Sequence, residues 1–122
     1  MKSYLIITCL LFSNSVYAYE ALYGIWQGSG IQDNGNQWTI RIHAEKEFVV
    51  IDYPSLTCGG VLKPQKTKNM SFVFKEQLRY GIKQCLNHGD VVLIKTAHNK
   101  LRYHWFGDNG LLQATGNLSK VQ

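Results

Sequence analysis

The chain has 122 residues, of which 13 are Lys or Arg and 8 are Asp or Glu, so its net charge is +5. This length fits one domain. The densest basic run, Lys63, Lys66 and Lys68, lies beside Pro64 and is typical of a solvated turn. Because nucleic-acid binding needs a basic stripe interleaved with exposed aromatic side chains, we predict no nucleic-acid partner.

The first 18 residues have the pattern of a secretory signal peptide. A basic start precedes an apolar run over residues 4–12, and the small residues Val16 and Ala18 indicate a cleavage site. The apolar run is about half the ~20 residues that a spanning helix needs, so we predict no membrane span. We expect residues 1–18 to be removed and residues 19–122 to form a single domain, in the periplasm or outside the cell.

Three cysteines occur in the chain, and Cys9 lies inside the predicted signal peptide. Its removal leaves Cys58 and Cys85. Two remaining cysteines in an oxidising compartment predict one disulfide. A free thiol nucleophile or a pair of metal ligands is the alternative, which export makes less favourable.

Residues 53–60 predict a rigid corner between two strands. Pro54 has no N–H to donate and holds the residue before it extended, which suits the end of a strand. Ser55 and Thr57 are typical turn residues, and the two glycines after Cys58 allow a bulge or a close approach by a neighbouring strand. The predicted disulfide would join this corner to the segment that carries the second cysteine.

The rest of the chain consists of short segments in which apolar and polar residues alternate, separated by turns rich in Gly, Asn and Asp. About eight strands are predicted, over residues 22–31, 38–43, 48–53, 61–62, 70–80, 90–96, 101–106 and 111–118. The short fourth strand is expected to end at Pro64. Consecutive hairpins favour an all-β fold, either an up-and-down antiparallel barrel or a strongly curved sheet, with a β-sandwich as the second choice.

Six short motifs follow one another along the chain. They are Trp26-x-Gly28, Tyr53-Pro54-Ser55-Leu56-x-Cys58-x-Gly60, Glu76-x-Leu78-x-Tyr80-Gly81-x-x-x-Cys85, Gly89, Leu101-x-Tyr103-x-Trp105 and Ala114-x-Gly116-x-Leu118. In this order they resemble a family of small exported bacterial β domains, some of which are attached to the outside of membrane protein kinases. The resemblance covers nearly all of residues 19–122, and the Tyr-Pro-Ser-Leu-x-Cys corner is its most specific part. It implies the β fold and the disulfide, and a role in sensing or binding.

Glu76 is the most informative polar residue. Strand alternation places it with apolar neighbours and with Tyr80 on one face, which we predict to be interior. A carboxyl group there must be paired, hydrogen-bonded or neutral, since an unpaired buried charge is very costly. Either Glu76 fixes a ligand or accepts a proton inside the barrel, or it is a buried partner for Arg41, Arg79 or backbone N–H groups of the corner.

Three tryptophans from three strands, Trp26, Trp38 and Trp105, are predicted to face inward. They either fill the barrel or line a cavity, because an eight-stranded barrel has room for its side chains or for one small ligand. In a cavity, Glu76 and Tyr80 would be the polar anchors, since pockets combine apolar walls with a few placed polar groups. These five residues are the predicted ligand-binding set.

The sequence predicts an exported binding or sensing module without catalytic activity, whose partner is a small ligand or a protein. One alternative is a small hydrolase that uses Glu76 or Ser55 with a histidine, although the sequence lacks a nucleophile elbow and paired carboxylates. A second alternative is a secreted inhibitor that inserts the corner into another protein. The four histidines lack metal-ligand spacing, so neither a metal nor a cofactor is predicted.

Overall fold

The computed structural model describes residues 19–122, which form eight β-strands and two short 3-10 helices. The helices are η2 (Glu20–Leu22) and η3 (Pro54–Leu56). The strands are β1 (Gly24–Gln32), β2 (Gln37–Ala44), β3 (Val49–Tyr53), β4 (Cys58–Lys68), β5 (Ser71–Tyr80), β6 (Asp90–Ala97), β7 (Lys100–Phe106) and β8 (Leu112–Lys120). The predicted signal peptide, with Cys9, lies outside the described residues.

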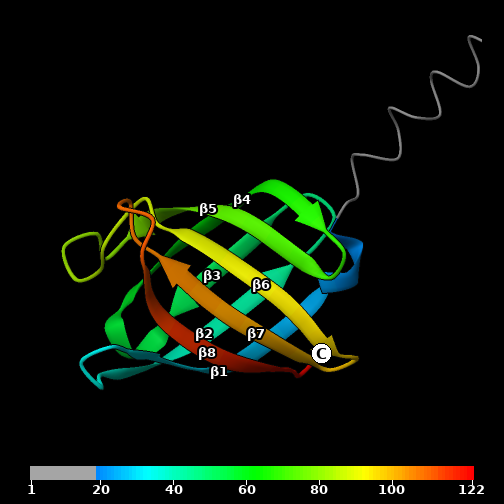
Figure 1. Ribbon diagram of the computed structural model, residues 1–122, viewed down its shortest axis with the longest axis horizontal. Coiled ribbons are helices and arrows are strands. Elements are labelled where there is room, and N and C mark those ends of the chain that lie inside the picture. Colours follow the sequence, from blue (N-terminus) through cyan, green and yellow to red (C-terminus); the bar gives the residue numbers. More distant parts are fainter. Residues whose placement is uncertain (1–18) are drawn as a thin grey trace, which may run out of the picture.

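The strands form one closed barrel in which each pairs antiparallel with its neighbours in sequence and β1 pairs with β8 (Figure 1). The structure therefore confirms the predicted all-β barrel and not the sandwich. Because the chain reverses direction at every hairpin, the connections β1–β2, β3–β4, β5–β6 and β7–β8 gather at one end of the barrel. The other end carries η2 and the C-terminus (Figure 1).

Alternation along the strands sends one set of side chains, mostly aliphatic and aromatic, into the barrel. Those of this set with 2% exposure or less include Ile40, Ile42, Ile51, Leu62, Phe72, Phe74, Val91, Leu93, Leu101 and Leu118. Removing this surface from water stabilises the fold by about 25 cal/mol for each Å² of apolar area. The hydrophobic interior is therefore the main source of stability, as the period-two pattern of the sequence predicts.

The end of the barrel that carries η2 is closed by side chains. Trp26 is fully buried there, and its indole Nε1 donates a hydrogen bond to the Leu22 carbonyl at 2.9 Å. The Tyr19 hydroxyl donates to the Lys46 carbonyl at 2.8 Å, which joins the segment before η2 to the β2–β3 turn. These bonds hold η2 across the barrel opening.

β4 is longer than the sequence predicted, because it continues through Pro64 to Lys68. β3 pairs only with residues 58–61 of β4, so Pro64 lies beyond this pairing, in the kind of edge position where proline is tolerated. A register shift against β5 between Pro64 and Lys66 further accommodates the missing N–H. The chain instead turns at Asn69, whose φ is +57°. The predicted strand end at Pro64 was wrong.

Candidate functional site

A pocket of about 400 Å³ lies at the end of the barrel where the β1–β2, β3–β4 and β5–β6 connections meet. Its lining combines aromatic rings, aliphatic groups and side-chain amides. The lining residues are Gln32, Asn36, Gln37, Trp38, Tyr53, Leu56, Gln84, Cys85, Leu86, Tyr103, Trp105 and Ala114. The inner part is built by strand residues of β3 and β7, and the outer part by the connections.

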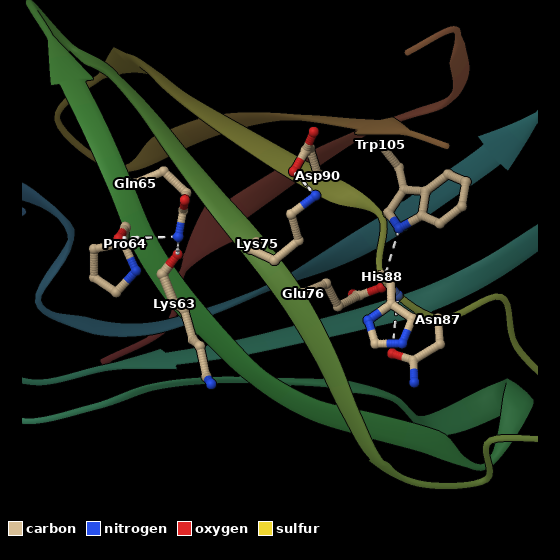
Figure 2. A network of polar contacts seen from close by, with 9 residues as sticks. All are labelled: Lys63, Pro64, Gln65, Lys75, Glu76, Asn87, His88, Asp90 and Trp105. Carbon is tan, nitrogen blue, oxygen red and sulfur yellow. Dashed lines mark hydrogen bonds and ion pairs between the residues drawn. The ribbon is translucent and has the colours of Figure 1, made fainter. Parts of the chain in front are cut away.

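Glu76 lies within the barrel beside two residues of this lining. Its side chain is 1% exposed, and each carboxylate oxygen has a donor: the Tyr53 hydroxyl lies 2.5 Å from Oε2, and Trp105 Nε1 lies 3.0 Å from Oε1. Figure 2 shows Glu76 directed toward the Trp105 indole, whereas the preceding Lys75 is directed away from Glu76 toward Asp90, its partner at 2.7 Å. The alternation of β5 thus separates an exposed ion pair from a buried carboxyl group.

Two tyrosines extend this network. The Tyr53 and Tyr103 hydroxyl oxygens lie 2.7 Å apart, and their rings meet edge to face. Tyr53 has one hydroxyl hydrogen, which it donates to Glu76, so Tyr103 donates to Tyr53. When Glu76 is protonated, it can donate to Tyr53 in turn, and the bond between the tyrosines reverses. The network therefore accommodates either protonation state of Glu76.

Burial dominates the acid–base properties of these groups. It raises the pKa of Glu76 from its ordinary value, although the hydrogen bonds from Tyr53 and Trp105 oppose the rise. Burial also raises the pKa of Tyr53 and of Tyr103 well above 10, and the nearby Tyr103 and Glu76 add to the effect on Tyr53. Both tyrosines are therefore neutral donors at physiological pH.

Of the five predicted ligand-binding residues, the structure brings Trp38, Trp105 and Glu76 to this end of the barrel. Trp38 and Trp105 line the pocket, and Glu76 lies behind Tyr53 and Trp105. Trp26 faces inward as predicted, but it lies at the closed end, away from the pocket lining. Its indole packs against η2 instead.

The interior position predicted for Tyr80 is wrong. Gly59 pairs with Tyr80 and Gly60 with Leu78, so Arg79 is an extra residue in β5 that reverses the alternation. Tyr80 is consequently 47% exposed and donates a hydrogen bond to the Asp52 carboxylate on the outside of the barrel. This bond is the main reason that the pKa of Tyr80 is raised to about 12.

The disulfide between Cys58 and Cys85 is present, as the sequence predicted, with the two Cα atoms 6.5 Å apart. Cys58 is the first residue of β4 and is fully buried, whereas Cys85 lies in the β5–β6 connection. Cys85 and its neighbours Gln84 and Leu86 line the pocket. The disulfide therefore fixes one wall of the pocket to the barrel.

The corner is attached to β2 by a reciprocal pair of hydrogen bonds. Thr39 N–H donates to the Ser55 hydroxyl at 2.9 Å, and Ser55 N–H donates to the Thr39 hydroxyl at 3.1 Å. These bonds hold Leu56, the residue of η3 that lines the pocket. They give Ser55 a positioning role, and the hydrolase that would use it stays a prediction.

Gly89 allows the β5–β6 connection to pass over Trp105. A Cβ atom at this position would lie 2.4 Å from the indole ring. The Gly89 carbonyl also accepts the backbone N–H of Glu76 at 2.9 Å. We expect Gly89→Ala to lower the free energy of unfolding by about 1–3 kcal/mol, since overpacking forces side chains or backbone to move.

Urea unfolding with tryptophan fluorescence tests this expectation. Gly107→Ala is the matched control, because a Cβ atom there would chiefly meet the flexible end of Gln113. Equal losses of stability in the two variants would show that the contact with Trp105 is unimportant.

Sequence reasoning missed part of this site. It proposed Arg41, Arg79 or the corner backbone as partners of Glu76, whereas the partners are Tyr53 and Trp105. Tyr53 and Tyr103 share the inward parity of their strands, and this signal was available in the sequence. Of the four amide side chains of the lining, Asn36 and Gln84 come from connections, and Gln32 and Gln37 are the strand residues that border the β1–β2 connection. Connections have no periodic pattern, so no sequence signal identifies these four residues.

Within residues 19–122, no cluster of three or more His, Cys, Asp or Glu side chains is arranged to hold a metal ion. Over the same range, no helix has the length and apolar character needed to cross a membrane. The likeness to exported bacterial β domains stays a prediction from the motifs. Comparisons with family models, with curated proteins and with solved structures gave no match for this chain.

Proposed function

We propose that this protein is an exported binding or sensing module that holds one small molecule in the open end of its barrel without catalysing a reaction. The observation that carries the proposal is the pocket of about 400 Å³, with aromatic walls and amide groups among its lining. Small-molecule sites usually have this character, mostly apolar with a few placed polar groups. Export is inferred from the signal peptide predicted at residues 1–18.

The three indole groups provide a direct test by NMR. Small metabolites and periplasmic extract are added to the labelled protein while the three indole N–H signals are followed. Ligand entry should move the signals of Trp38 and Trp105, which line the pocket, and leave that of Trp26, which is buried at the other end. A library in which no compound moves either pocket signal would contradict the proposal.

Trp38 offers the most direct substitution, because it lines the pocket and is only partly buried. We expect Trp38→Ala to weaken any ligand found in the screen by about tenfold or more, since an aromatic wall supplies large contact area. Phe48→Ala is the control, because Phe48 is an exposed aromatic residue next to the β2–β3 turn, at the opposite end. Titration calorimetry measures the affinity of each variant for the ligand. Equal affinities in Trp38→Ala and Phe48→Ala would mean that the ligand binds outside this pocket.

A protein partner is the second candidate, and the exposed apolar side chains at the same end favour it. Ile82 and Leu86 in the β5–β6 connection are 54% and 64% exposed, and Leu111 in the β7–β8 connection is 63% exposed. Exposed apolar groups that gather in one place are typical of interaction surfaces. In an inhibitor, Ile82→Ser with Leu111→Ser, both outside the pocket lining, would abolish binding to the target protein and leave small-molecule titrations unchanged.

A further inference from the structure

Charged side chains near the pocket all lie outside its lining. None of its twelve lining residues, all within the described part of the chain, is Lys, Arg, His, Asp or Glu. Asp33, Lys83 and Asp108 lie in connections at this end but outside the lining. Glu76 is bonded directly to two lining residues, Tyr53 and Trp105. The inner pocket therefore combines aromatic rings with one carboxyl group buried behind them, and an aromatic face and a carboxylate both favour a cation over an anion.

The position of Glu76 limits which cation fits. Its two oxygens already accept the Tyr53 hydroxyl and the Trp105 indole N–H. A primary ammonium group carries three donors that need acceptors, and Glu76, which lies behind Tyr53 and Trp105 and not in the lining, is not placed to accept from them directly. A quaternary ammonium group has no donor. It gains the attraction of the carboxylate and of the ring faces while the existing bonds stay intact.

We propose that the pocket binds a quaternary ammonium compound, an inference that rests on the proposed function and names its ligand class. The methylated nitrogen lies among Trp38, Tyr53, Tyr103 and Trp105, next to the buried Glu76. The remainder of the ligand is short and polar, and it meets the side-chain amides of the lining. Four aromatic residues and one enclosed carboxylate are the chemistry that recognises such a group.

Choline and 3,3-dimethylbutan-1-ol test the charge directly, because they have the same shape and differ by the positive nitrogen. Each is titrated into the purified protein, with affinity from calorimetry and position from the Trp38 and Trp105 indole signals. We expect choline to bind at least tenfold more tightly than the neutral alcohol, because the positive nitrogen is attracted both by the aromatic rings and by the buried carboxylate. Ethanolamine, which has the primary ammonium, should bind more weakly than choline.

Glu76→Gln removes the charge and keeps the shape, so it should reduce the preference for choline severalfold and leave the affinity for the neutral alcohol unchanged. Asp52→Asn is the matched control, because Asp52 precedes Tyr53 in β3 but its carboxylate accepts a hydrogen bond from Tyr80 outside the barrel. This variant should keep the full preference. If Glu76→Gln fails to fold, the affinities of the unmodified protein for choline and for the neutral alcohol are sufficient to test the inference.

Equal binding of choline and the neutral alcohol would overturn the inference, and so would an unchanged preference in Glu76→Gln. If both compounds fail to bind while other metabolites move the Trp38 and Trp105 signals, the ligand class is wrong and the binding function stands. If no compound in the metabolite screen moves these signals, the binding function itself fails.

Discussion

Replacing Cys58 and Cys85 together with alanine should lower the free energy of unfolding by about 3–4 kcal/mol. The disulfide closes a loop whose ends are 27 residues apart in sequence, and a cross-link of this span restricts the unfolded chain by about that amount. Urea unfolding of the variant and of the unmodified protein measures the difference. The loss is a large fraction of the 5–15 kcal/mol that stabilises a typical domain.

Two comparisons separate the cross-link from the loss of packing. The unmodified protein is also unfolded in the presence of a reductant, and its stability should fall to near that of the double variant. Single variants at Cys58 and at Cys85 should match each other if the bond is what matters, even though Cys58 is the more buried residue. A double variant within 1 kcal/mol of the oxidised protein would contradict the expectation.

The disulfide variant should also loosen the pocket before it unfolds the barrel. Cys85 holds the β5–β6 connection, and Gln84, Cys85 and Leu86 form part of the pocket lining. Amide hydrogen exchange should therefore rise over residues 81–89 more than in the strands, because local opening starts where few buried contacts hold the chain. Uniform exchange across β1–β8 would indicate that the bond stabilises only the domain as a whole.

The barrel was predictable because the sequence pattern that specifies its strands and turns is local and periodic. Segments such as Trp38–Ile40–Ile42 alternate with polar residues, and each predicted turn joins two such segments. The closure of β1 onto β8 follows once eight strands in consecutive hairpins are accepted. The disulfide was predictable for a different reason, since removal of the predicted signal peptide would leave only one pair of cysteines.

The errors arose where a single residue changes the geometry of two strands. The extra residue at Arg79 reverses the face of Tyr80, and the bulge near Pro64 lets β4 continue to Lys68. Neither is set by the strand alone, since a bulge depends on the partner strand. Sequence reasoning placed Trp38 and Trp105 at a possible cavity but could not assemble the rest of the lining, because Gln32, Leu56 and Gln84 come from three separate segments.

Replacing Glu76 with alanine should lower the free energy of unfolding by about 2–4 kcal/mol. The substitution removes the acceptor of two buried donors, the Tyr53 hydroxyl and the Trp105 indole, and each unsatisfied group costs roughly 1–3 kcal/mol. The release of a buried carboxylate offsets part of this cost. Thermal or urea unfolding at neutral pH measures the result, and a change within experimental error would mean that Tyr53 and Trp105 find other partners.

Glu76→Gln separates the charge from the hydrogen bonds, since the amide can accept from Trp105 and donate to Tyr53 while Tyr53 donates to Tyr103. The pKa of Glu76 is raised above 4.5 in the folded protein, so the folded state holds its proton more tightly than the unfolded state. The stability that Glu76 contributes is therefore fully present below pH 4.5 and is lost as pH rises through the raised pKa. The stability of the unmodified protein minus that of Glu76→Gln should accordingly fall as pH rises from acid to neutral, because other groups cancel in the difference. A difference that grows with pH would mean that the two hydrogen bonds outweigh burial and that the pKa of Glu76 is depressed.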